Sequence, residues 1–140
     1  MQFKAGVFLT RHDDPLGKCI GNQLEIEETI ECLHGNSPWD IEELVTKYGG
    51  YLLARTDKAH TMSEGAKMIQ EKLRNGEALK KFHEMIVAQG VDERLAHELC
   101  YNRNYAQVFQ SKAKHVTQIK SKSSGNSSFH LFLIEIIMQL

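Results

Sequence analysis

The sequence carries almost no net charge, because 17 lysines and arginines are balanced by 18 aspartates and glutamates. Proteins that bind nucleic acid or an anionic membrane usually carry an excess of positive charge on one face. Four lysines do gather between Lys112 and Lys122, but Gln, Ser and Thr separate them and no Phe, Trp or Tyr lies among them. We interpret this segment as a solvated linker, and we expect neither nucleic acid nor a membrane as a partner.

The sequence is also poor in cysteine and has no long hydrophobic run. Its three cysteines form no CxxC motif and no Cys/His pair at zinc-finger spacing, which favours reduced thiols inside the cell. No run has the length of a transmembrane helix, and the N-terminal apolar run is too short for a signal peptide. We therefore expect a cytoplasmic protein. At 140 residues it fits one domain, or a piece of a larger one.

Strand character at the start of the chain is confined to one short segment. Residues 4–11, "KAGVFLTR", are rich in strand-forming side chains and end at a polar turn, so they predict one buried strand. A single strand cannot form a sheet. The chain therefore looks like a fragment of a larger α/β protein.

The two segments after this strand predict helices with clear start and stop signals. The first begins with Asn22 as its N-cap, carries glutamates in its first turns and stops at Gly35. In the second, Ser37 is the cap and Pro38 the first helical residue. The glycine pair at 49–50 weakens that helix, so we expect a kink or a close helix contact there.

Three further helices complete a mainly α body of one strand and about five helices. A capping box at 61–64 starts the third helix, which stops at 75–76. The fourth covers 77–89 and the fifth about 92–101. The segment at 121–128, "SKSSGNSS", is a low-complexity linker.

The chain ends in the apolar run "FHLFLIEIIMQL". It is too short for a membrane anchor and has no following segment to pack against. We expect residues 1–125 to form a partial α/β domain and residues 126–140 to be an unrelated tail, disordered or non-native.

The stretch "DDPLGKCIGNQLEIEETIECLHG" carries the clearest candidate for a site. Where glycines let a chain curl back, backbone carbonyls converge, and one carboxylate completes a cage for a hard cation. Glu28 lies one turn after Leu24, on the side that can face the turn at 16–20. A tight strand-to-helix corner explains the same glycines and is the simpler interpretation.

Two pairs of side chains offer weaker alternatives. His97 and Cys100 make half a zinc site at most, and an exposed histidine beside a core cysteine explains them equally. Cys32 and His34 could form a nucleophile pair, although no third orienting group follows from spacing. The dipole at the end of a helix also accounts for His34.

Several linked motifs resemble the thymidine phosphorylase family, within the pyrimidine-nucleoside phosphorylases. They are "LTRHDDPLGKCIGNQLEIEETIECLHG", "PWDIEELVTKYGGYLL", "EGAKMIQEKLRNGEALKKFHEMIVAQGVD" and "LAHELC". The resemblance extends from about residue 4 to residue 99, is weak to about 125 and is absent after 126. It implies an internal segment of the large α/β domain of a homodimeric pentosyltransferase. Such enzymes cleave thymidine or deoxyuridine with phosphate, giving the free base and 2-deoxyribose 1-phosphate.

The resemblance also implies which residues this chain holds. The family's phosphate loop and pyrimidine-holding residues lie upstream of everything matched, so we expect no catalytic or substrate-binding residue here and no activity of the chain alone. It implies one wall of a potassium site, made by the backbone carbonyls of Leu16 and Cys19 and by Glu28, and no organic cofactor. The alternative is a non-catalytic helical interaction module, or a truncated isoform that binds the full-length enzyme.

Overall fold

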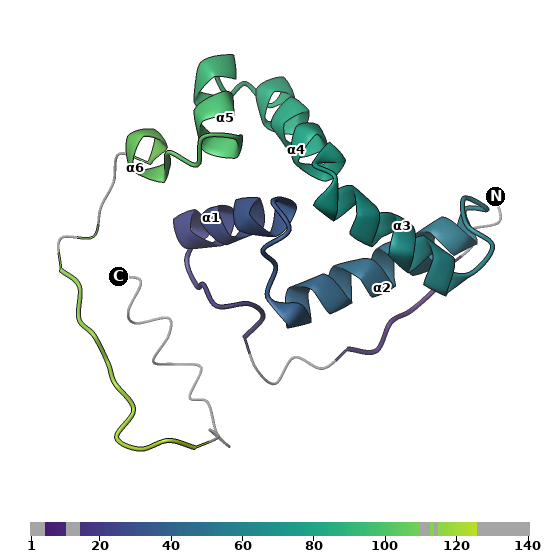
Figure 1. Ribbon diagram of the computed structural model, residues 1–140, viewed down its shortest axis with the longest axis horizontal. Coiled ribbons are helices and arrows are strands. Elements are labelled where there is room, and N and C mark those ends of the chain that lie inside the picture. The colour runs from purple at the N-terminus through teal and green to yellow at the C-terminus, as the bar shows by residue number, and fades with distance from the viewer. Residues whose placement is uncertain (1–4, 11–14, 110–112, 114, 126–140) are drawn as a thin grey trace.

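The structure is a computed structural model. It describes residues 5–10, 15–109, 113 and 115–125. These residues form six helices and no strand, which confirms the mainly α prediction (Figure 1). No helix in this part of the chain is both long and apolar enough to cross a membrane. The prediction for the tail at 126–140 lies outside the described residues.

The prediction of a buried N-terminal strand is wrong for the described residues 5–10, which have no regular secondary structure. Their side chains are exposed, and Leu9 is 99% exposed. A strand needs a neighbour to satisfy its backbone groups, and the described residues supply no second strand. The segment instead lies beside a helix, where the Phe8 and Tyr48 ring centroids are 4.5 Å apart.

Helix α1, Asn22–Leu33, forms where the sequence predicts it. Its N-cap is Gly21 and not Asn22, which is the first helical residue. Gly21 adopts φ 124°, which favours glycine, and its N–H donates 2.9 Å to the Glu25 carboxylate in the first turn. Gly35, at φ 87°, confirms the predicted stop.

Helix α2, Trp39–Arg55, also begins one residue later than its sequence signals indicate. Pro38 is the cap, with ψ 143°, and is not the first helical residue. The predicted cap, Ser37, uses its hydroxyl to donate a 3.5 Å hydrogen bond to the Cys32 carbonyl of α1. The Ser37 side chain therefore bonds to the preceding helix, α1, and does not cap α2.

The glycine pair marks a close contact between α2 and α3, Met62–Arg74, as predicted (Figure 1). A Cβ atom added to Gly50 would lie 2.5 Å from the Met62 carbonyl oxygen and 2.6 Å from the Ala66 nitrogen. One added to Gly65 would lie 2.6 Å from the Gly50 carbonyl oxygen. The two backbones therefore touch at a point where no side chain fits.

The capping box at the start of α3 is confirmed. The Thr61 hydroxyl accepts a 3.1 Å hydrogen bond from the Glu64 N–H. The Glu64 carboxylate accepts in return from the His60 N–H, at 2.9 Å, one residue before the cap. The Thr61 bond satisfies an amide of the first helical turn that has no partner within the helix, and the Glu64 bond holds the residue just before the cap.

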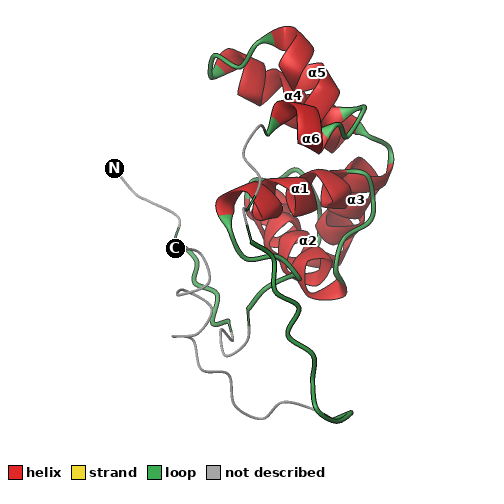
Figure 2. Cartoon of the chain, turned by 90° about the vertical axis from the view of Figure 1, so that its left-hand side faces the viewer, coloured by secondary structure: helices red, strands yellow, loops and turns green. Residues whose placement is uncertain are grey.

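The remaining helices are α4, Glu77–Ala88, α5, Glu93–Cys100, and α6, Tyr105–Val108. The short α6 was not predicted. Figure 2 shows α4, α5 and α6 grouped at one end and α1, α2 and α3 at the other. The main apolar cluster draws its residues from α1, α4 and α5: Ile30, Leu79, Ile86, Ala96, Leu99 and Cys100. After α6, residues 115–125 are exposed and irregular.

Candidate functional site

The turn at 16–20, just before α1, is held by two carboxylates from two helices. The Gly17 N–H donates a 2.9 Å hydrogen bond to Oδ2 of Asp40, in the first turn of α2. The Lys18 N–H donates a 2.8 Å hydrogen bond to Oε1 of Glu28, in α1. Glu28 therefore faces the turn, as its place in the sequence predicts.

Two features of Gly17 favour glycine at this position in the turn. Its φ of 73° lies in the left-handed region, which residues with a side chain rarely adopt. A Cβ atom there would also lie 2.4 Å from Oε2 of Glu28 and 2.7 Å from Cδ1 of Ile41. Because glycine leaves this space free, the second oxygen of the Glu28 carboxylate lies directly against the backbone of the turn.

The charges around the turn decide which atoms could bind a cation. Burial, followed by the nearby Glu28, Glu27 and Glu25 carboxylates, raises the pKa of the Cys19 thiol. The thiol therefore stays protonated at neutral pH, and a thiol is a poor ligand for a hard cation. Any contribution of Cys19 to a cation site would come from its carbonyl oxygen.

The weaker candidates have structural roles. The His34 Nε2–H donates a 2.8 Å hydrogen bond to the Cys100 carbonyl oxygen, which joins the end of α1 to the end of α5. Burial raises the pKa of both the Cys32 and Cys100 thiols, so neither is an activated nucleophile. Among the described residues, no three His, Cys, Asp or Glu side chains gather in a way that could hold a metal ion. The His97 and Cys100 pair therefore finds no third ligand there.

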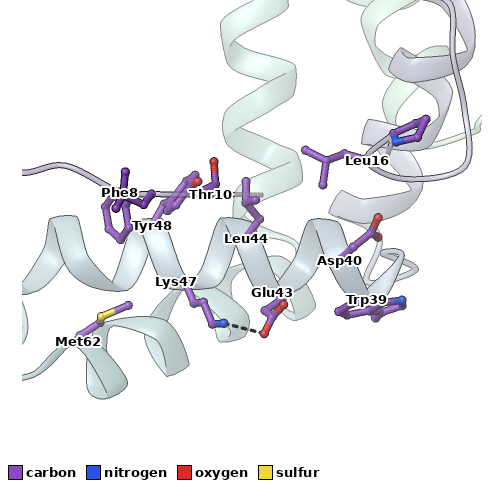
Figure 3. A pocket seen from close by; sticks show the side chains of 12 residues that line it. Phe8, Thr10, Leu16, Trp39, Asp40, Glu43, Leu44, Lys47, Tyr48 and Met62 are labelled. Atoms are coloured by element: carbon purple, nitrogen blue, oxygen red, sulfur yellow. Dashed lines mark hydrogen bonds and ion pairs between the residues drawn. The ribbon is translucent and has the colours of Figure 1, made fainter. Parts of the chain in front are cut away.

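A groove of about 560 Å³ lies beside the turn, along α2 (Figure 3). Phe8 and Tyr48 lie against each other at one part of it, and Leu16 borders another (Figure 3). An ion pair of 2.7 Å between Lys47 and Glu43 lies among the lining side chains. The groove is lined by Phe8, Leu9, Thr10, Pro15, Leu16, Trp39, Asp40, Glu43, Leu44, Lys47, Tyr48 and Met62.

Comparison with curated proteins shows what this chain is similar to. It is 46% identical over 92 residues to the thymidine phosphorylase of Homo sapiens, and 41% identical over 97 residues to that of Mus musculus. It is 34% identical over 122 residues to the pyrimidine-nucleoside phosphorylase of Staphylococcus aureus (strain USA300). The chain is homologous to a segment of these phosphorylases.

The phosphorylase similarity covers 66%, 69% and 85% of this chain in the human, mouse and bacterial comparisons. The chain spans only 19%, 21% and 28% of the length of those same phosphorylases. No protein-family model matches the chain. The resemblance seen in the sequence motifs is thus confirmed, and it concerns a segment of each relative.

In this chain, Asp40 is the site residue that the sequence patterns did not indicate. It is separated from Gly17 by 23 positions, and no periodicity joins a turn to the start of a second helix. The only signal was an acidic residue near a helix start, which the helix dipole explains by itself. In the folded chain, the Gly17 hydrogen bond is the largest of the effects that lower the pKa of Asp40.

Proposed function

We propose that this segment belongs to an enzyme that converts thymidine and phosphate into thymine and 2-deoxyribose 1-phosphate. The observation that supports this most strongly is the 46% identity to human thymidine phosphorylase over 92 residues. In the reaction, the glycosidic bond between C1′ of the sugar and N1 of the base breaks, and C1′ bonds to a phosphate oxygen. The enzyme would be a pentosyltransferase of pyrimidine nucleoside salvage and catabolism, and we propose a cytoplasmic homodimer built on an α/β domain.

The isolated chain is proposed to be inactive, because the groups that bind phosphate and pyrimidine are expected in other parts of the enzyme. The test is a phosphorolysis assay with thymidine, phosphate and the purified 140-residue chain. A complete thymidine phosphorylase in the same assay is the positive control. We expect no release of thymine above background, and turnover by the chain alone would contradict this part of the proposal.

The turn at 16–20 is proposed to supply one wall of a potassium site. The ligands are the carbonyl oxygens of Leu16 and Cys19 and the carboxylate of Glu28. Two observations support the fit: the Glu28 carboxylate lies against the turn through its bond to the Lys18 N–H, and the absence of a side chain at Gly17 leaves space beside that carboxylate. Bound potassium would neutralise Glu28 and hold the turn near the phosphate loop of the complete enzyme.

The cation proposal is tested by the carbonyl carbon resonances of Leu16 and Cys19 in the labelled chain. We expect both to shift when potassium chloride is added and to stay in place with the same concentration of tetramethylammonium chloride. Glu28→Gln should abolish the response, because it removes the charge that attracts the cation. Glu43→Gln, on the exposed side of α2, is the matched control and should retain it. Equal responses to the two salts would contradict the proposal.

The alternative function is a helical interaction module, or a truncated isoform, that binds the full-length phosphorylase without catalysis. The feature that favours it is the apolar groove along α2, at whose end Trp39 is 79% exposed. Co-purification of the tagged chain with full-length enzyme would support this alternative. Absence of co-purification, together with absence of turnover, would leave the inactive segment as the better account.

A further inference from the structure

We infer that Asp40 is a positioning residue that sets the direction of the Leu16 carbonyl in the turn at 16–20. The inference rests on the cation site proposed above, because Leu16 is one of the ligands of that site. Asp40 is not a ligand in this account. It acts through the peptide group that joins Leu16 to Gly17.

The geometry of the peptide group carries the argument. The Gly17 N–H and the Leu16 carbonyl belong to the same peptide unit, and none of the described peptide bonds is cis. In a trans peptide the N–H and the carbonyl lie in one plane and point in opposite directions. Since the Gly17 N–H donates to Oδ2 of Asp40 at 2.9 Å, the Leu16 carbonyl is directed away from Asp40.

The Asp40 carboxylate is itself held in place. Its other oxygen, Oδ1, accepts a 2.9 Å hydrogen bond from the Ile41 N–H in the first turn of α2. Each oxygen thus has a backbone donor, one in the helix and one in the turn. A side chain fixed at both oxygens transmits the orientation of α2 to the turn with little rotational freedom.

Asp40 and Glu28 each hold one of the two peptide groups beside Gly17. Asp40 holds the peptide group before Gly17, and Glu28 holds the one after it through the Lys18 N–H at 2.8 Å. Gly17, at φ 73°, is the joint between these two planes. The arrangement assigns a separate carboxylate, from a separate helix, to each peptide plane of the turn.

The experiment measures amide hydrogen exchange and carbonyl carbon shifts in the full 140-residue chain by NMR. In Asp40→Ala we expect the Gly17 amide to exchange about tenfold faster, because one hydrogen bond to a charged acceptor is lost. The carbonyl carbon resonance of Leu16 should also shift in this variant. The Lys18 amide, which is held by Glu28, should keep its wild-type exchange rate. Asp40→Asn retains an oxygen acceptor and should restore part of the Gly17 protection.

The matched control is Glu43→Ala. Glu43 is an acidic residue of the same helix, and its side chain pairs with Lys47. It should leave the Gly17 and Leu16 resonances unchanged. An Asp40→Ala chain that keeps the wild-type exchange rate at Gly17 would overturn the inference, as would equal acceleration at Lys18. If Asp40→Ala does not fold, the Asp40→Asn chain decides: an unchanged Leu16 carbonyl and Gly17 amide would overturn the inference.

The two proposals fail in different ways. If the wild-type Leu16 and Cys19 carbonyls do not respond to potassium, the cation site is overturned, whatever Asp40 does. If they respond to potassium equally in the wild-type and Asp40→Ala chains, the site stands and the positioning role of Asp40 is overturned.

Discussion

The Tyr105 hydroxyl donates a 3.0 Å hydrogen bond to Oε1 of Glu31, which joins α6 to α1 across 74 positions of the chain. Arg103 also pairs with this carboxylate, at 3.3 Å, and Asn36 donates to it at 3.1 Å. This cluster fastens the last described helix onto the first. Tyr105, Val108 and Phe109, in and just after the short α6, also pack against the main apolar cluster.

We predict that Tyr105→Phe lowers the free energy of unfolding by about 1 kcal/mol, because it removes one hydrogen bond to a carboxylate. Urea unfolding followed by circular dichroism measures the change. Tyr101→Phe is the control, since the Tyr101 ring packs at 5.0 Å from the His97 ring and does not contact Glu31. An equal loss in both variants would mean that the Tyr105 hydroxyl contributes nothing specific.

The Glu31 cluster also predicts a pH dependence. Burial alone would raise the pKa of Glu31, but hydrogen bonds from Asn36 and Tyr105 and the charge of Arg103 lower it overall. A carboxylate with a lowered folded-state pKa stabilises the fold above its unfolded pKa and loses this stabilisation as pH falls through the folded value. We therefore expect the free energy of unfolding to decrease as the pH is lowered below about 5, and to decrease less steeply in Glu31→Gln.

Chemical unfolding at a series of acid pH values measures this slope. Glu27→Gln is the control, because Glu27 accepts its hydrogen bond from Gln23, one turn away in the same helix. The prediction is wrong if Glu31→Gln and the wild-type chain lose stability with the same slope.

The contact between α2 and α3 predicts different effects at adjacent glycines. A new Cβ at Gly50 meets backbone atoms of α3 at 2.5 and 2.6 Å, whereas one at Gly49 meets the side chain of Ile69 at 2.6 Å. A side chain can shift and backbone in a paired helix cannot. We expect Gly50→Ala to cost roughly 1–3 kcal/mol of stability, with a smaller loss in Gly49→Ala.

Thermal unfolding of the two variants side by side provides the measurement. Both gain the same helix propensity, about 1 kcal/mol from replacing glycine with alanine, so the difference between them isolates the packing effect. Equal stability of the two chains would contradict the close contact at Gly50.

The cap of α3 predicts that Thr61→Ala lowers stability by about 1 kcal/mol. The threonine hydroxyl accepts the Glu64 N–H at 3.1 Å, and alanine leaves that amide without its partner. Ser63→Ala, two residues into the same helix, is the control and should have little effect. Urea unfolding compares them, and the cap has no energetic role if the two variants lose equal stability.

The three cysteines should differ in their reaction with a thiol reagent. Cys19 is half-buried, whereas Cys32 and Cys100 are buried at 8% and 0% exposure. Labelling of the native chain, followed by mass spectrometry of peptides, should find Cys19 modified first and the other two only on unfolding. Because nearby carboxylates help to raise the pKa of Cys19, Glu28→Gln should speed its labelling at neutral pH.

Local sequence signals account for most of the secondary structure. The capping box at Thr61, the stop at Gly35 and the apolar spacing of α4 act within one or two helical turns, so they can be read directly from the sequence. The caps of α1 and α2 were misplaced by one residue. In α2, the Ser37 side chain found a partner in α1, and short-range patterns do not include such competition.

The error in the N-terminal strand has a different cause. Residues 5–10 have the composition of a strand, but a strand forms only when a neighbour pairs with its backbone. The described residues contain no such neighbour, and Phe8 packs on Tyr48 instead. The short α6 was not predicted because its hydrogen-bond partner, Glu31, lies 74 positions away in the sequence. Local patterns do not include such a distant contact.

The sequence by itself determined where helices α1 to α5 lie, the preference for glycine at the turn and the proteins to which the segment is related. Only the tertiary structure decided that Asp40 and Glu28 each hold one peptide plane beside Gly17, and that Gly50 and Gly65 bring two backbones together. Helix signals act over a few residues along the chain. These contacts join residues 10 to 23 positions apart, and their geometry exists only after the helices have packed.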